Sequence, residues 1–216
     1  MRTSLAAALA TVLAFGCTDQ PLPTASSDSP VVGAAFSASG KGGAVVTQTV
    51  DILDTGPGAI TSGTATLTRN AKGLWLTGQS DDLVVGHAYT VWAAIFDNPN
   101  GCAGACGGGS FGVREAQATL SVFGGFVVGA AKDFAIHLSR HDASRQTLAG
   151  LGRSGIDNTY RAEVHAIFKS HGVAETDPGD LADQTSMAGA FCNLPVVGCE
   201  DQGVAIFNPP GPPGQG

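Results

Sequence analysis

Glu163 and His165 are the residues of this 216-residue chain whose types and spacing best suit chemistry. Apolar and polar residues alternate around them, which indicates a β-strand. Residues two apart on a strand point to the same face, with their Cα atoms about 6.5–7 Å apart. A carboxylate and an imidazole so placed can hold a divalent transition metal if a neighbouring strand supplies a third ligand. His87 or His171 would complete such a site.

Two other interpretations of Glu163 and His165 remain open. The pair belongs to a solvated outer face and binds no metal, or it acts as an acid and a base. In each case the residues between and beside them should face the core, namely Ala162, Val164, Ala166 and Phe168.

Other polar groups give weaker indications of a site. His137 and His141 lie four apart on an expected strand, roughly 13 Å from each other and too far for a shared ion. Residues 175–183 carry four carboxylates that calcium could use, but their spacing matches no EF-hand, so we expect a solubilising surface loop. Residues 97–101 are expected to form a turn.

Standard catalytic signatures are mostly absent from the sequence. Residues 152–156 fail the nucleophile-elbow pattern, and no HExxH motif occurs. Four aromatic residues suit either a sugar-stacking platform or the core: Trp75, Tyr89, Trp92 and Tyr160.

The five cysteines set a pairing problem, because an odd number leaves one unpaired in an oxidising compartment. Lipidation of Cys17 would leave four, which allow three connectivities. Proximity favours Cys102 with Cys106 and Cys192 with Cys199, each in a loop that contains Gly or Pro. The alternative is a four-thiolate zinc site, but neither pair has the usual two-residue gap.

The elements that must position these residues are short β-rich runs separated by Gly, Asn, Asp and Pro. Residues 62–69 and 74–77 should form a hairpin through the turn at 70–73. Gly124 and Gly125 indicate a bulge or a turn within 116–128. The runs are 45–53, 62–69, 74–77, 87–96, 116–128, 134–141, 161–170 and 204–207. They predict an all-β fold, an antiparallel β-sandwich or a partly closed barrel of eight or nine strands.

Composition agrees with this fold class. The chain has 31 Gly, 11 Pro and only 13% charged residues, which excludes a helical bundle with solvated faces. Its 43% hydrophobic residues suffice for a core. The net charge of −7 argues against nucleic-acid binding.

The N-terminus has the features of an export signal, with Arg2 followed by an apolar run and small residues. Residues 13–17, Leu-Ala-Phe-Gly-Cys, resemble a bacterial lipobox, which implies that Cys17 is lipidated and becomes the mature N-terminus; ordinary secretion with later cleavage is the alternative. We therefore expect a signal peptide over 1–16, a lipid-anchored flexible tether over 17–40, a β-sandwich domain over 41–208 and a disordered Pro/Gly tail over 209–216.

Several motifs together resemble a group of exported bacterial all-β proteins and lipoproteins of unknown function. They are Gly86-His87-Ala88-Tyr89-Thr90-Val91-Trp92, Phe96-Asp97-Asn98-Pro99, the loop of Cys102 and Cys106, Ala162-Glu163-Val164-His165 and Lys169-Ser170-His171-Gly172. The resemblance implies an extracytoplasmic domain and supplies no catalytic residue. Residues 62–67 are weakly similar to strands of chordin-type domains, whose paired-histidine segment is not recognisable here.

The sequence thus predicts an exported cell-envelope domain that acts by binding or as a structural component, without a cofactor. By resemblance, it would be an outer-membrane lipoprotein that faces the periplasm or the cell surface. Its predicted partner is the membrane, reached through Cys17. The alternative is a metal-binding protein or metal-dependent enzyme that uses Glu163, His165 and a further histidine.

Overall fold

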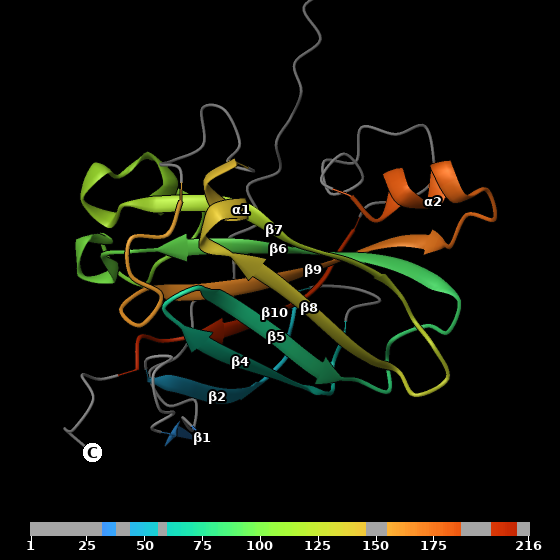
Figure 1. Ribbon diagram of the computed structural model, residues 1–216, viewed down its shortest axis with the longest axis horizontal. Helices are drawn as coiled ribbons and strands as arrows, with labels where there is room; N and C mark the ends of the chain where they lie inside the picture. The colour runs from blue at the N-terminus through green and yellow to red at the C-terminus, as the bar shows by residue number, and fades with distance from the viewer. Residues whose placement is uncertain (1–31, 38–43, 56–59, 146–154, 187–199, 211–216) are drawn as a thin grey trace, which may run out of the picture.

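The computed structural model describes residues 32–37, 44–55, 60–145, 155–186 and 200–210 (Figure 1). Its strands form two five-stranded antiparallel sheets: sheet I in the order β1-β2-β4-β5-β8 and sheet II in the order β3-β10-β9-β6-β7. The strands are β1 (Val32–Ser37), β2 (Val45–Asp51), β3 (Leu53–Asp54), β4 (Thr64–Asn70), β5 (Gly73–Gln79), β6 (His87–Phe96), β7 (Ala118–Val127), β8 (Asp133–Ser139), β9 (Glu163–Val173) and β10 (Glu200–Phe207).

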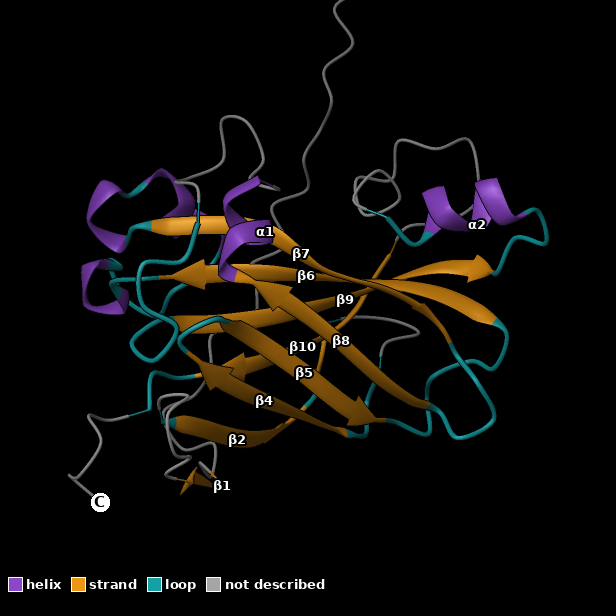
Figure 2. Cartoon of the chain, in the orientation of Figure 1, coloured by secondary structure: helices purple, strands orange, loops and turns teal. Residues whose placement is uncertain are grey.

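The two sheets pack face to face, so the prediction of an all-β sandwich is confirmed, and they remain separate rather than closing into a barrel. Strands dominate the described residues, and the short helices lie outside the sheets (Figure 2). The strand count exceeds the expected eight or nine because β1 and the two-residue β3 are added. β1 lies within the stretch predicted as tether, so the folded sheet begins before residue 41.

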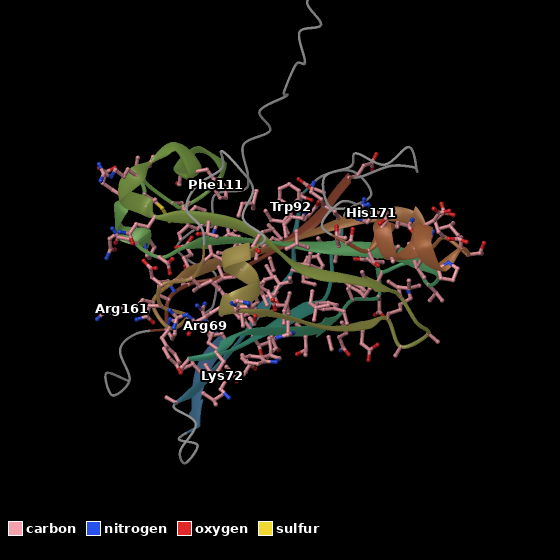
Figure 3. All side chains as sticks on the ribbon, turned by 45° about the horizontal axis from the view of Figure 1, so that its top comes forward. Arg69, Lys72, Trp92, Phe111, Arg161 and His171 are labelled. Atoms are coloured by element: carbon pink, nitrogen blue, oxygen red, sulfur yellow. A yellow bond between two sulfur atoms is a disulfide. The ribbon has the colours of Figure 1, made fainter. Side chains whose placement is uncertain are left out.

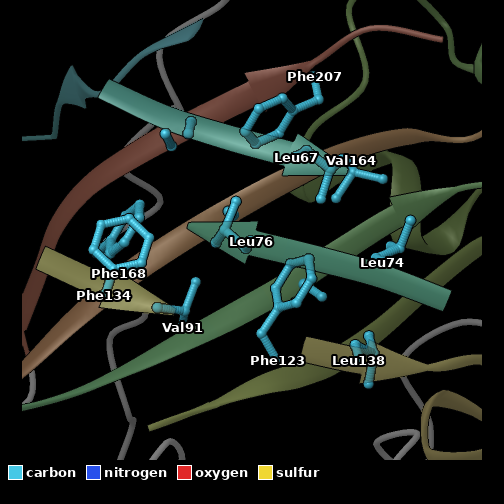
Figure 4. Packing of buried hydrophobic residues seen from close by; sticks show 14 of the residues in the cluster. Leu67, Leu74, Leu76, Val91, Phe123, Phe134, Leu138, Val164, Phe168 and Phe207 are labelled. Carbon is cyan, nitrogen blue, oxygen red and sulfur yellow. The ribbon is translucent and has the colours of Figure 1, made fainter. Parts of the chain in front are cut away.

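The core between the sheets follows from the alternation of the strands. Ala65 and Leu67 of β4 are buried while the threonines between them are partly exposed. Both belong to the cluster between the sheets, which also contains Val91, Val164 and Phe168 of sheet II (Figure 4). Each such Leu, Val or Phe contributes about 1.5–3 kcal/mol when fully buried, which makes this cluster the main source of stability.

The β4–β5 hairpin forms as predicted. Its strands pair from Thr64–Gln79 to Asn70–Gly73, and the turn closes when the Lys72 amide donates to Asn70 Oδ1 at 2.7 Å. A Cβ at Gly73 would lie 2.5 Å from the carbonyl oxygen of Leu138, so the close approach of β8 requires glycine here.

Two segments contain a helix that was not predicted: the end of the strand predicted at 134–141 and the loop predicted at 175–183. β8 stops at Ser139, whose hydroxyl accepts from the Asp142 amide at 2.9 Å and starts helix α1 (Arg140–Arg145). His141 therefore lies on a helix rather than on the strand predicted to include it. The acidic segment was expected to be a loop, but it contains helix α2 (Pro178–Gln184), capped by Asp177, whose carboxylate accepts from Gly179 and Asp180.

The glycine pair in β7 forms a bulge rather than a turn. The register between β6 and β7 shifts at Val91 and Trp92, opposite Gly124, whose φ is 145°. Glycine adopts that conformation without the strain that a side chain would add. β7 therefore continues as one strand.

Arg69 is a buried cation that ties sheet I to the end of sheet II. Its guanidinium donates to the carbonyls of Thr159 and Ala162, at 3.0 and 2.6 Å, and to those of Phe207 and Asn208, at 3.2 and 3.4 Å. Burial lowers the pKa of Arg69 to about 9, and the charge of Glu163 opposes that shift. The side chain therefore stays charged at neutral pH and holds the last residues of β10 against β4.

Candidate functional site

The outer face of sheet II, which carries Glu163 and His165, is covered rather than open. The loop over 97–117 contains three short 3-10 turns, η1 (Pro99–Gly101), η2 (Gly108–Gly112) and η3 (Arg114–Ala116). It packs onto this face and forms a second apolar cluster. That cluster contains Ala94, Phe96, Cys106, Ala116, Ala118, Leu120, Ile167 and Val204, with Leu53, Trp92, Cys102, Phe111, Val113 and Ile206 at its margin.

A disulfide joins Cys102 to Cys106 within this loop. This confirms the first of the two favoured pairings. Cys17, Cys192 and Cys199 lie outside the described residues, so the second pairing and the lipidation of Cys17 stay predictions. The disulfide fixes the loop that carries Phe111, whose ring lies 5.5 Å from that of Phe96 between centroids.

Glu163 and His165 share one face, as the two-residue spacing predicts, and they are hydrogen-bonded. His165 Nε2 lies 2.7 Å from Glu163 Oε1, and the two side chains are only 4% and 13% exposed. The rings of His165 and Phe96 pack edge to face, with their centroids 5.2 Å apart. The expectation of a solvated face is therefore wrong, because the disulfide loop and its apolar side chains exclude water from it. The residues expected opposite the pair, Ala162, Val164, Ala166 and Phe168, are all in the core.

His171 and His87 lie far from this pair. His171 follows His165 by six residues on β9, about 20 Å at the rise of a strand, and His87 pairs with Val173 at the same distant end. Within the described ranges no three side chains of His, Cys, Asp or Glu gather where they could hold one metal ion. The structure thus brings Glu163 and His165 together, but it places neither His87 nor His171 close enough to be a third metal ligand.

His171 belongs to a separate polar cluster beneath α2. Its Nε2 lies 2.7 Å from Thr90 Oγ1, and Gln184 Nε2 donates to the carbonyls of His171 and Val173 at 3.2 and 3.1 Å. Burial lowers the pKa of His171, and the charge of Lys169 lowers it further. The imidazole is therefore a neutral partner of Thr90 at neutral pH.

α2 sits directly on β7 at this end of the sheet. A Cβ at Gly125 would lie 2.2 Å from the carbonyl oxygen of Thr185, so only glycine allows this contact. Between α2 and the disulfide loop, Lys169 lies 4.9 Å from the centre of the Trp92 ring and forms an ion pair with Asp201. Figure 3 shows Trp92 between Phe111, which belongs to the disulfide loop, and His171, which lies beneath α2.

The buried pair has limited chemical scope. A carboxylate bound to an imidazole can orient the ring and stabilise its protonated form. The His165 ring is bonded to Glu163, and both side chains are almost completely buried, which leaves little of either group open to a substrate. The geometry therefore favours a structural or metal-ligating role over acid and base catalysis.

The four aromatic residues considered as a sugar-stacking platform lie in different parts of the molecule. Tyr89 is in the core, Trp92 packs at the margin of the second cluster, and the Tyr160 hydroxyl donates to the Ala44 carbonyl at 2.6 Å. Trp75 alone among the four stands on the outer face of sheet I. There it stacks on His137, with ring centroids 5.6 Å apart and planes inclined by 28°.

That outer face of sheet I is rich in threonine, and no described element covers it. The strands β2, β4, β5 and β8 alternate, so that each buried residue is flanked by residues that point outward. We call this surface the threonine face; it consists of Thr47, Thr49, Thr64, Thr66, Thr68, Trp75, Thr77, Ala135 and His137. The alternation predicts these threonines on one face of each strand, but only the cross-strand register brings them together.

Comparison of the chain with protein-family models, with curated proteins and with solved structures gives no match. The resemblance to exported bacterial proteins therefore rests on the sequence motifs alone. No helix in the described part of the chain is long and apolar enough to cross a membrane.

Proposed function

We propose that this protein is an exported cell-envelope domain, anchored by a lipid on Cys17, that acts by binding rather than by catalysis. The anchor would place it at the outer membrane, facing the periplasm or the cell surface. Its N-terminal sequence, with a charged start, an apolar run and a cysteine, supports this location.

The disulfide between Cys102 and Cys106 is the observation that carries the proposal. Disulfides persist in oxidising compartments and are rare in the cytosol, where thiols are kept reduced. A disulfide that holds a loop over a second apolar cluster is therefore what we expect of a protein that folds after export.

The contrast between the two outer sheet faces supports binding. The face with the Glu163–His165 pair is covered, whereas the threonine face is open and carries Trp75 and His137. A broad, uncharged surface suits an extended ligand better than a reaction that must exclude water.

Metal binding is the second candidate, because the 2.7 Å contact already joins two potential ligands. If it is correct, elemental analysis of the purified full chain should find stoichiometric transition metal, and Glu163→Ala with His165→Ala should remove it. Metal-free wild-type protein after incubation with zinc would contradict this candidate.

Mass spectrometry of the mature protein tests the main proposal. We expect a diacylated or triacylated Cys17 at the N-terminus, and we expect Cys17→Ala to release the protein from the membrane fraction. Cleavage beyond Cys17 would contradict the anchor. Free thiols at Cys102 and Cys106 in protein trapped directly from cells would contradict export.

A further inference from the structure

The outward-facing side chains of the threonine face form a regular lattice. Its first row runs across four strands through Thr47, Thr68, Trp75 and His137, and its second through Thr49, Thr66, Thr77 and Ala135. Neighbouring strands lie about 4.7–4.9 Å apart, and successive outward residues of one strand about 6.6–6.8 Å apart. Hydroxyl groups therefore repeat in two directions over this surface.

Four of these hydroxyls are linked in two pairs, and each pair keeps further bonding capacity. Thr47 Oγ1 lies 3.2 Å from Thr68 Oγ1, and Thr49 Oγ1 lies 2.8 Å from Thr66 Oγ1. A hydroxyl donates one hydrogen bond and accepts two, so each pair can still bond an outside group. The threonine methyl groups beside them provide small apolar contacts, which makes the surface amphipathic.

Trp75 and His137 form a stacked aromatic pair in the first row, which we call the aromatic step. The Trp75 ring is partly exposed, and the His137 ring stacked against it is exposed. Flat rings offer a large contact area at a low cost in side-chain entropy. An occupant with flat C–H surfaces could therefore rest on this step.

Charge decides which occupant fits. The two rows contain no Asp, Glu, Lys or Arg, although the chain carries a net charge of −7. The acidic residues Asp51 and Asp133 lie in the next row, at the edge of the face. The surface therefore does not attract polyanions such as nucleic acid or phosphate-rich polymers, and an uncharged ligand loses no ionic solvation on binding.

We propose that the threonine face binds a neutral polysaccharide chain. The C–H faces of pyranose rings match the aromatic step and the threonine methyl groups, and the sugar hydroxyls match the free donors and acceptors of the lattice. The proposal rests on the binding function above and names the class of ligand for the open face.

The test measures retention of the purified full chain, in detergent, on insoluble cellulose, curdlan, chitin and mannan, with alginate beads as a carboxylated comparison. Ala135→Arg changes an exposed position in the second row, and Val173→Arg introduces the same charge at a 71% exposed position outside this face. His137→Ala removes the exposed half of the aromatic step. Circular dichroism and thermal unfolding confirm that each variant is folded.

We expect retention on at least one neutral polysaccharide, weakened about tenfold or more by Ala135→Arg because the long arginine side chain would occupy the surface that the polysaccharide must contact. His137→Ala should weaken it several-fold, and Val173→Arg should behave as wild type. No retention on any neutral polymer, or equal retention of Ala135→Arg and wild type, would overturn the assignment. Retention on alginate alone would also overturn it, yet would leave the proposed exported binding domain standing. A lipid-free chain with reduced cysteines would instead remove the proposed function.

Discussion

Replacing Arg69 with methionine should destabilise the fold strongly. The guanidinium donates to four carbonyl oxygens at 2.6–3.4 Å, and its side chain is fully buried. A buried carbonyl without its donor costs about 1–3 kcal/mol, but methionine also relieves the burial of a cation. The net loss should resemble that for removing one partner of a buried charged network, about 3–5 kcal/mol.

Urea titration followed by tryptophan fluorescence measures this change, and calorimetry should show the melting temperature lowered by roughly 6–20 °C. Arg161→Met is the matched control, because Arg161 is exposed; its effect should stay within about 0.5 kcal/mol. If Arg69→Met and Arg161→Met unfold within about 1 kcal/mol of each other, the arginine does not hold the sheets together and the reasoning fails.

Three further predictions test local contacts. Gly125→Ala should destabilise by about 1–3 kcal/mol, because its Cβ would lie 2.2 Å from Thr185 O; Gly129→Ala, with no atom within 4 Å of its Cβ, is the control in the same urea titration and should be far milder. Burial holds the pKa of His171 below its usual 6.5, so the unfolded chain takes up the proton first and stability is lost as pH falls below that value. His171→Gln should therefore reduce the difference between urea midpoints at about pH 7 and about pH 5, and an unchanged difference would exclude this cause. Cys106→Ser should cost about 2 kcal/mol for so short a loop, whereas an unchanged melting temperature would show that the disulfide is dispensable.

Sequence alone predicted the strands where local alternation or continuous apolar runs dominate. The predicted run 87–96 is β6 in both bounds, and the turn at 70–73 joins β4 to β5. These features depend on side-chain period and turn residues within a few positions of each other. Helix starts were missed where a capping residue, Ser139 or Asp177, overrides a weak local pattern.

The second apolar cluster was not predicted, although β6 contained a signal for it. Ala94 and Phe96 face away from the main core, yet both are buried. A strand apolar on both sides indicates burial on both faces, and 87–96 is nearly continuous in this respect. What covers that strand could not be predicted, because the apolar residues of 97–117 are scattered among glycines and show no period.

In the candidate site, too, contacts set by local spacing were predictable and contacts between distant residues were not. The shared face of Glu163 and His165 follows from a spacing of two. The contact of His171 with Thr90 joins residues 81 positions apart, and the rows of the threonine face depend on register between four strands. Such contacts are fixed by the fold as a whole.

The position of β10 has a consequence for synthesis. This last strand lies between β3 and β9, so sheet II stays divided until residues 200–207 are available. Arg69 likewise finds two of its acceptors only at Phe207 and Asn208. A nascent chain is made from its N-terminus and cannot complete this sandwich before residues 200–208 are made. Deletion of β10 should therefore be more damaging than its eight residues suggest.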